Sequence, residues 1–88
     1  MSKMIIDVRE PEEYQTRHST GAFNIPLLEL DNAAELMTLD KDTDIVVYCR
    51  TGDRSEVAKQ LLNAKGFNKV TNGVNAETVA CDYGIGLE

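Results

Sequence analysis

The sequence has few of the residues that build metal sites and disulfide scaffolds. Its 88 residues include two cysteines, Cys49 and Cys81, and one histidine, His18. Two cysteines do not form a disulfide framework, and neither they nor the histidine show the paired spacing of a zinc site. We therefore expect neither a metal ion nor a cofactor.

Long apolar runs and an excess of basic residues are also missing. No segment is long and apolar enough to span a membrane, and 9 lysines and arginines face 15 acidic residues, a net charge of −6. Nucleic acids and anionic membranes bind basic patches, so we expect neither as a partner. Because the first residues lead directly into an apolar strand, we expect no signal peptide in this sequence. A cytoplasmic location is therefore the default expectation, and a periplasmic one would require that a leader had been removed.

The most informative stretch is an apolar run that ends at a cysteine and leads into a helix. Residues 45–48, Ile-Val-Val-Tyr, are apolar without alternation, which favours a central parallel strand covered on both faces. Cys49 follows at the carboxyl end of this strand, where open α/β sheets place their ligands. From Ser55, apolar residues recur at helical spacing as far as a stop at Gly66.

The position of Cys49 before a helix favours a reactive thiolate. The unpaired amides and the dipole at a helix N-terminus attract negative charge, and a thiol pKa there falls from about 8.5 to roughly 3.5–7.5. Gly52 is free to adopt a positive φ that turns loop amides toward the sulfur, and two arginines add donors suited to an oxyanion. We predict an accessible, nucleophilic Cys49; the alternative is an unreactive core thiol with solvated arginines. The predicted substrate-binding loop consists of Arg50, Thr51, Gly52, Asp53 and Arg54.

Three stretches resemble, in the same order, the signatures of rhodanese-type sulfurtransferases. They are residues 6–14 (IDVREPEEY), 18–26 (HSTGAFNIP) and 49–55 (CRTGDRS). The resemblance spans Met4 to about Gly73 and is strongest to small single-domain thiosulfate sulfurtransferases of the bacterial phage-shock type. It implies that Cys49 attacks the outer sulfur of thiosulfate, releases sulfite and carries the sulfur as a persulfide, which cyanide or a thiol, including a protein thiol, then removes. It also implies that the loop amides hold the persulfide and that the guanidinium groups orient the thiosulfate.

Two other functions remain open beside sulfur transfer. Cysteine-dependent phosphatases and arsenate reductases use a similar loop, but phosphatases have one residue more between the cysteine and the arginine. Here four residues separate Cys49 from Arg54, and the smaller ring suits a sulfur atom better than a tetrahedral phosphate. The other alternative is a rhodanese-shaped sulfur-relay or protein-binding module whose acceptor is a partner protein.

Strands alternate with helices along the predicted chain. This order predicts one small three-layer α/β domain over residues 1–88, with a mostly parallel sheet of four or five strands, and the resemblance implies the rhodanese arrangement. Beside the central strand, strands are expected over residues 4–8, 22–25 and 67–71. Helices are expected from residue 11, over residues 27–39 and over residues 76–82.

Several residues of the N-terminal signatures could act in the site or only in the fold. Asp7 and Arg9 either bond backbone amides near the central loop, which we favour, or shape the pocket. His18 is expected to stabilise a turn and not to act in catalysis. Where the family usually has an aliphatic residue and a proline, this chain has Ser19 and Thr20, so we expect a looser turn.

The C-terminal part departs from the family pattern. The family commonly has a glycine pair and often a tryptophan near Gly73, whereas here Val74 follows the glycine and tryptophan is absent. Cys81 is expected to be a small packing residue. The alternative is a disulfide with Cys49 that resolves a persulfide, which requires Cα atoms within about 7 Å.

Overall fold

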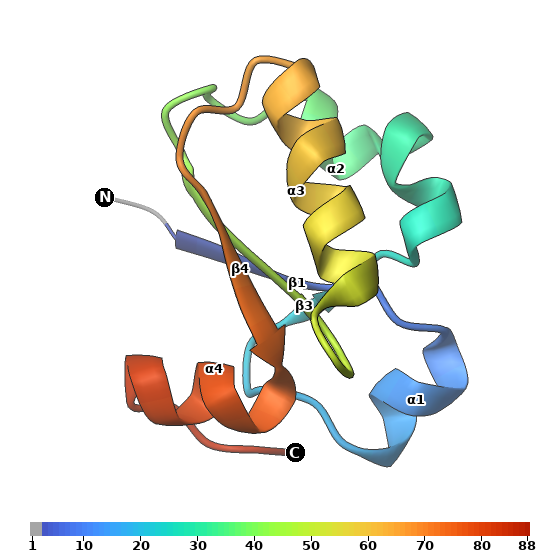
Figure 1. The fold of residues 1–88 in the computed structure, drawn as a ribbon, viewed down its shortest axis with the longest axis vertical. Helices are drawn as coiled ribbons and strands as arrows, with labels where there is room; N and C mark the ends of the chain where they lie inside the picture. Colours follow the sequence, from blue (N-terminus) through green and yellow to red (C-terminus); the bar gives the residue numbers. More distant parts are fainter. Residues whose placement is uncertain (1–2) are drawn as a thin grey trace.

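The computed structural model describes residues 3–88, which form one wholly parallel four-stranded sheet in the order β2-β1-β3-β4. The strands are β1 (Lys3–Asp7), β2 (Phe23–Asn24), β3 (Asp44–Cys49) and β4 (Val70–Asn75). The helices are α1 (Pro11–Thr16), the 3₁₀ helix η1 (Leu27–Asn32), α2 (Ala34–Met37), α3 (Asp53–Ala64) and α4 (Ala76–Tyr83) (Figure 1). The predicted α/β class and parallel sheet are confirmed. Within residues 3–88, every helix is too short or too polar to cross a membrane.

The central strand β3 is buried on both faces. Ile45, Val47 and Cys49 belong to the core that contains the buried residues of α3, η1 and α2. Val46 and Tyr48 belong to a second core, which contains the buried residues of α4. None of these five side chains is more than 2% exposed, which explains the apolar run without alternation. The alternation of side chains along β3 therefore turns Cys49 toward α3.

The single helix predicted over residues 27–39 is wrong. The segment instead forms η1 and the short α2, and the chain is extended at Ala33, with φ −70° and ψ 118°. Asp31 and Asn32 precede this break, and both residue types favour caps and turns over helix interiors. The break still lets Leu30 and Leu36 enter the core beside α3.

The strand predicted over residues 67–71 lies three residues later, at β4. Phe67 is only 1% exposed and packs in the core beside α3, while its amide donates to the carbonyl of Leu62 at 3.1 Å, as expected for a turn at the end of a helix. The apolar side chain at 67 therefore fills the core from a turn and not from a strand.

A β-bulge interrupts β4 beside the active-site loop. Asn72 and Val74 oppose consecutive residues of β3, so Gly73 is an extra residue between them. A Cβ atom on Gly73 would lie 2.4 Å from Cγ2 of Val79 on α4. Glycine is therefore required by the close approach of α4 to the sheet.

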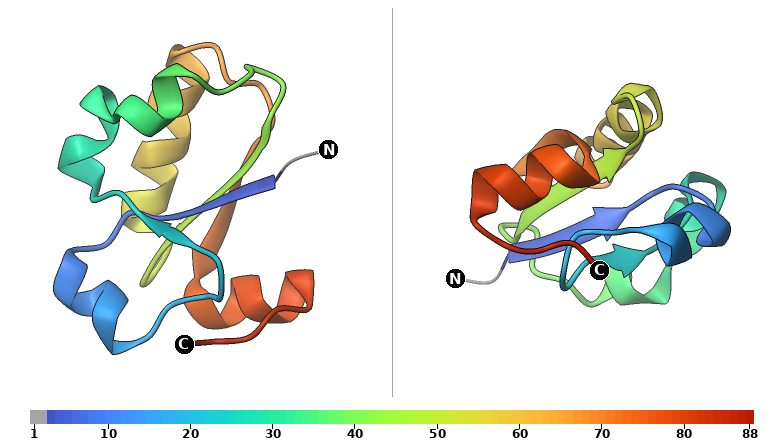
Figure 2. Two further views of the ribbon diagram at one scale, coloured as in Figure 1. Left: turned by 180° about the vertical axis from the view of Figure 1, so that it is seen from behind. Right: turned by 90° about the horizontal axis from the view of Figure 1, so that it is seen from below.

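The C-terminal tail pairs with the segment that precedes β2 (Figure 2). The amide of His18 donates to the carbonyl of Glu88 at 3.0 Å, and the amide of Glu88 donates back at 2.8 Å. Thr20 donates to the carbonyl of Gly86 at 2.9 Å. These bonds hold the tail against a turn near the start of the chain.

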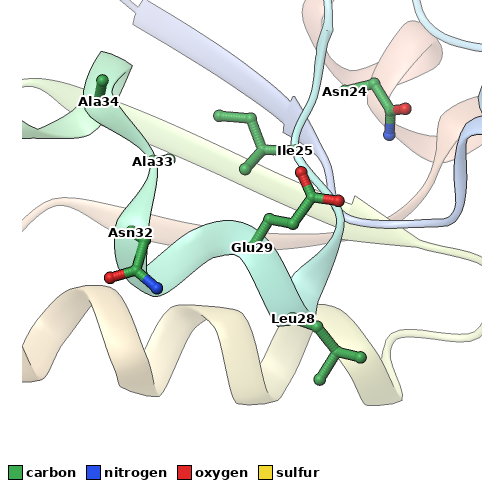
Figure 3. Close-up of a pocket in the computed structure, with 7 residues that line it drawn as sticks. All are labelled: Asn24, Ile25, Leu28, Glu29, Asn32, Ala33 and Ala34. Atoms are coloured by element: carbon green, nitrogen blue, oxygen red, sulfur yellow. The ribbon is translucent and has the colours of Figure 1, made fainter.

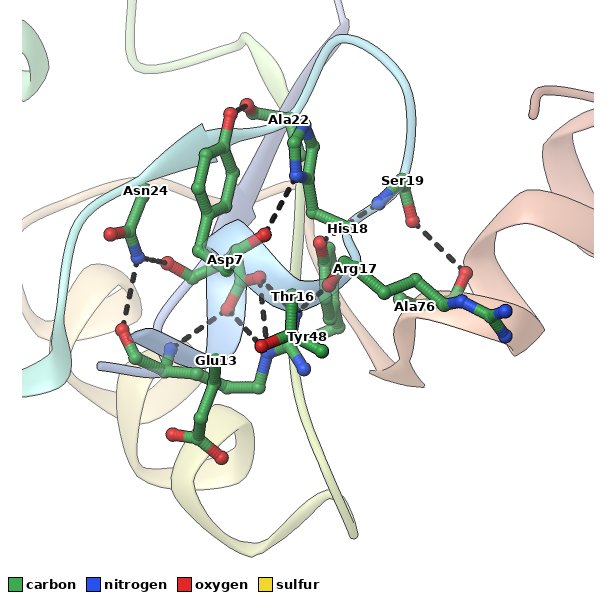
Figure 4. Close-up of polar contacts among 12 residues, drawn as sticks. Asp7, Glu13, Thr16, Arg17, His18, Ser19, Ala22, Asn24, Tyr48 and Ala76 are labelled. Carbon is green, nitrogen blue, oxygen red and sulfur yellow. Dashed lines mark hydrogen bonds and ion pairs between the residues drawn. The ribbon is translucent and has the colours of Figure 1, made fainter. Parts of the chain in front are cut away.

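Ser19 does not loosen this turn as expected, because it is fully buried and bonded. Its hydroxyl donates to the carbonyl of Ala76 at 3.0 Å, and its amide donates to the hydroxyl of Tyr48 at 3.1 Å (Figure 4). Nδ1 of His18 lies 2.8 Å from the carbonyl oxygen of Tyr14. The structural role expected for His18 agrees with these contacts.

Candidate active site

The candidate site lies where β3 passes into α3. Cys49 ends β3, and residues 50–52 connect it to the helix. Gly52 has the predicted positive φ, 97°, and its amide donates to Sγ of Cys49 at 3.1 Å. Because α3 begins at Asp53, Ser55 lies in its first turn, with Oγ 3.5 Å from the same sulfur.

The loop and the helix together lower the pKa of Cys49. Burial raises this pKa, but the hydrogen bonds that the thiolate can accept from the side chain and amide of Ser55, then from the amides of Gly52 and Thr51, outweigh burial and lower the pKa from 9.0 to about 7. Of the loop amides predicted to converge on the sulfur, the amide of Gly52 donates to it at 3.1 Å. A large fraction of the thiol is therefore ionised near neutral pH.

The prediction that Cys49 is accessible is wrong for this conformation. The residue is 0% exposed and belongs to the core beside α3. The reason is the alternation along β3, which turns the sulfur under the start of the helix. The sulfur is therefore shielded from solvent in this structure.

The guanidinium group of Arg54 is held by Glu13 of α1. Its two terminal nitrogens donate to the two carboxylate oxygens of Glu13 at 2.9 and 3.1 Å, a bidentate ion pair. Arg54 thereby lowers the pKa of Glu13 from 4.5 to about 2. Sequence reasoning missed Glu13, since the partners lie 41 residues apart. The role of Arg54 in orienting a substrate stays a prediction.

The other side chains of the loop face solvent. Arg50, Thr51 and Asp53 are exposed, and the hydroxyl of Thr51 donates to the carboxylate of Asp53 at 3.3 Å. Arg50 borders a cavity of about 510 Å³ that offers three guanidinium groups. Its lining consists of Arg9, Glu13, Thr16, Arg17, Arg50 and Glu77. This cavity is the candidate approach for an anionic substrate.

A second cavity, of about 390 Å³, lies beside η1 (Figure 3). Its lining contains one charged side chain, the carboxylate of Glu29, and no residue of the loop. The lining residues are Asn24, Ile25, Leu28, Glu29, Asn32, Ala33 and Ala34. We therefore assign the approach of an anionic substrate to the cavity at Arg50 and not to the cavity beside η1. Across residues 3–88, no group of three or more histidine, cysteine or acidic side chains is arranged to hold a metal ion.

Asp7 and Arg9 form a buried ion pair at the end of β1. Asp7 is fully buried and accepts hydrogen bonds from the amide of Arg9 at 2.9 Å and from its guanidinium group at 2.6–3.0 Å. The guanidinium group of Arg9 also donates to the carbonyl of Arg17. The favoured role of bonding a backbone amide is seen for Asp7, whereas Arg9 joins a structural ion pair and also lines the cavity at Arg50, as in the alternative role.

Asn72 on β4 is a second polar residue of the site that sequence reasoning missed. Its Oδ1 accepts from the hydroxyl of Ser55 at 2.6 Å and from the amide of Val74 at 3.0 Å. Its Nδ2 donates to the carbonyl of Gly52 at 3.1 Å and to the carboxylate of Glu56 at 3.2 Å. The amide thus fastens the loop and α3 to β4. The one feature of the sequence that indicates the bulge at this position is the pair Asn72-Gly73.

Cys81 lies on the exposed side of α4, so the expected packing role is wrong. The helix packs on the sheet through Ala76, Val79 and Ala80, which are at most 9% exposed. Both cysteines are free thiols.

Comparison with known proteins identifies the family. The model of the rhodanese-like domain matches residues 1–74. The chain is 40% identical over 75 residues to the thiosulfate sulfurtransferase PspE of Escherichia coli, which covers 85% of this chain and 72% of PspE. It is 41% identical over 70 residues to the putative sulfur carrier protein YrkF of Bacillus subtilis, which covers 80% of this chain but only 37% of that protein.

Solved structures agree with this result. An E. coli rhodanese determined with anions superposes with a TM-score of 0.81 at 38% identity, covering 90% of this chain and 93% of that chain. A rhodanese-like domain from Anabaena gives a TM-score of 0.82 at 29% identity, covering 99% of each chain. The rhodanese arrangement implied by the sequence is confirmed, and the relatives support sulfur transfer as the general activity. The protein described here belongs to the rhodanese-like domain family.

Proposed function

We propose that the protein is a thiosulfate sulfurtransferase in which Cys49 is the nucleophile. The observation that carries this proposal is that hydrogen-bond donors from Ser55, Gly52 and Thr51 lower the pKa of the Cys49 thiol to about 7. The similarity to PspE, which is named a thiosulfate sulfurtransferase, supports the choice of donor.

The reaction has two half-reactions on the same sulfur. The thiolate of Cys49 attacks the outer sulfur of thiosulfate, the S–S bond of thiosulfate breaks, and its electron pair leaves with sulfite. The product is a persulfide whose outer sulfur carries the negative charge. Cyanide then attacks the outer sulfur, the Sγ–S bond breaks, and thiocyanate leaves while the thiolate is regenerated. Such a covalent intermediate gives ping-pong kinetics.

The loop supplies electrostatic stabilisation instead of a general base. The thiolate forms without a neighbouring base because amide donors already favour the anion. The backbone amides remain in place when the charge passes to the outer sulfur of the persulfide, so the loop amides stabilise the anion in both half-reactions. Arg50, at the adjoining cavity, is the guanidinium group available to the sulfonate end of thiosulfate.

A sulfur relay to a protein acceptor is the second candidate. The similarity to YrkF, named a putative sulfur carrier protein, favours it. Exposed Arg50 and Thr51 place the outer face of the loop where a partner protein can contact it. Faster transfer of the persulfide sulfur to a protein thiol than to cyanide would favour this candidate.

The test is to incubate the protein with thiosulfate and to locate the added mass by peptide analysis. We expect one sulfur atom on the peptide that contains Cys49, and its loss on addition of cyanide. The Cys49→Ser variant should gain no sulfur, whereas Cys81→Ser should retain nearly all turnover because Cys81 lies exposed on α4. An unmodified Cys49 peptide, or turnover of an aryl phosphate comparable to that of thiosulfate, would overturn the proposal.

A further inference from the structure

The hydroxyl group of Ser55 has one hydrogen and two neighbours that could receive it. Oγ lies 2.6 Å from Oδ1 of Asn72 and 3.5 Å from Sγ of Cys49. Oδ1 is the carbonyl end of the Asn72 amide, since it also accepts from the amide of Val74, while Nδ2 donates to the carbonyl of Gly52. A carbonyl oxygen cannot donate, so the Ser55 hydrogen lies on the bond to Asn72.

This arrangement presents a lone pair of Ser55 to the sulfur. A neutral thiol can donate its hydrogen to that lone pair, but a thiolate gains a hydrogen bond only if the hydroxyl turns away from Asn72. Cys49 and Ser55 are both 0% exposed, so water cannot supply the missing donor. Ionisation of the thiol is therefore coupled to the direction of one hydroxyl group.

We propose that Asn72 is a positioning residue that sets the ionisation of Cys49 by competing with the sulfur for the Ser55 hydrogen. The hydroxyl turns to the sulfur in the thiolate and leaves Oδ1 of Asn72 with the Val74 amide alone. In the persulfide the charge moves to the outer sulfur, and the hydroxyl returns to Asn72. This last step rests on the proposed function, whereas the coupling between Asn72 and the free thiol does not.

Charged groups near this network have partners of their own. They are the pairs Asp7–Arg9 and Glu13–Arg54, and Glu56, which accepts from Nδ2 of Asn72. None of these contacts involves the Ser55 hydrogen, so the competition concerns Asn72 and Cys49 alone.

A double-mutant cycle tests the proposal, with Cys81→Ser as the common background so that Cys49 is the one thiol. The thiol pKa is read from the pH dependence of iodoacetamide alkylation in four proteins: the background, Asn72→Leu, Ser55→Ala and the double variant. One neutral hydrogen bond corresponds to a change of about 0.5 to 1 in pKa. We expect Asn72→Leu to lower the pKa of Cys49 by about this amount when Ser55 is present, and by less than about 0.2 after Ser55→Ala.

The cycle separates this mechanism from a purely structural role of Asn72. Looser packing of the loop would change the pKa equally whether or not Ser55 is present, because the bond from Asn72 to Gly52 is lost in both cases. Equal changes in the two backgrounds, or a rise in pKa after Asn72→Leu with Ser55 present, would overturn the proposal. Thiosulfate is absent from the assay, so failure here is distinct from failure of the proposed sulfur transfer.

A measurement on the unaltered protein covers the case in which a variant fails to fold. The side-chain amide signals of Asn72 are followed by NMR as the pH is raised through the pKa of Cys49. We expect them to shift with the midpoint of the thiol and to stop shifting in Cys49→Ser. The side-chain amide of Asn68, which donates to Asp42 in an exposed turn, is the control and should not follow this midpoint. Side-chain amide signals of Asn72 that do not shift as Cys49 ionises would contradict the proposal.

Discussion

Replacing Glu13 by glutamine should show how strongly the ion pair with Arg54 stabilises the site. Arg54 lowers the pKa of Glu13 from 4.5 to about 2, which corresponds to at most about 3 kcal/mol at neutral pH, with 1.36 kcal/mol for each pH unit. The side chains of Glu13 and Arg54 are 28% and 37% exposed, so solvent screening reduces this figure. We expect Glu13→Gln to lower the free energy of unfolding by about 1–2 kcal/mol at pH 7.

The pH dependence gives this prediction its sign. The pKa of Glu13 is lower in the folded protein, so its contribution is complete above about pH 5 and is lost as the pH falls from 4.5 toward 2. The difference in unfolding free energy between the protein and Glu13→Gln should therefore shrink over that range. Urea denaturation, followed by circular dichroism at several pH values, measures both quantities.

Glu12 provides a matched control for this experiment. It lies in the same first turn of α1 but is exposed, so Glu12→Gln should change the unfolding free energy by less than about 0.5 kcal/mol. Equal stability of Glu13→Gln and Glu12→Gln at pH 7 would refute the conclusion that the ion pair between α1 and α3 stabilises the fold.

Two further predictions concern the bulge in β4. Val74 has a φ of 74° and is 37% exposed, so Val74→Gly should relieve backbone strain and raise the free energy of unfolding by up to about 1 kcal/mol; lower stability would contradict this. Gly73→Ala places a Cβ atom 2.4 Å from Val79 and should destabilise by about 1–3 kcal/mol. The control Gly86→Ala, with its nearest contact at 3.3 Å, should have a smaller effect in the same denaturation assay.

The part of the fold that sequence reasoning predicted well depends on local signals. The apolar run of β3, the cysteine at its end and the positive φ of Gly52 each follow from neighbouring residues. Asn75, directly before the helix predicted over residues 76–82, caps α4 by accepting from the amide of Thr78 at 2.7 Å. These features need no knowledge of distant contacts.

The features that sequence reasoning missed depend on tertiary contacts. The break at Ala33 follows Asp31 and Asn32 and still leaves Leu30 and Leu36 in the core, so the apolar spacing alone did not distinguish it from one continuous helix. The position of β4 depends on the approach of α4 to Gly73.

The electrostatics of the site could likewise be predicted only in part from the sequence. The sequence indicated an activated thiol, and the donors around Cys49 confirm it. It did not indicate that the alternation of β3 buries the sulfur, or that Glu13 from the first signature binds Arg54 from the third. Both facts require the relative positions of elements far apart in the chain.

The most direct test of the account is the pKa of the Cys49 thiol in Cys81→Ser, measured from the pH dependence of its alkylation. The loop and the first turn of α3 predict that the rate rises with pH through a midpoint near 7. A midpoint near 8.5–9, the range of an unperturbed thiol, would contradict the claim that amide and hydroxyl donors hold this sulfur as an anion.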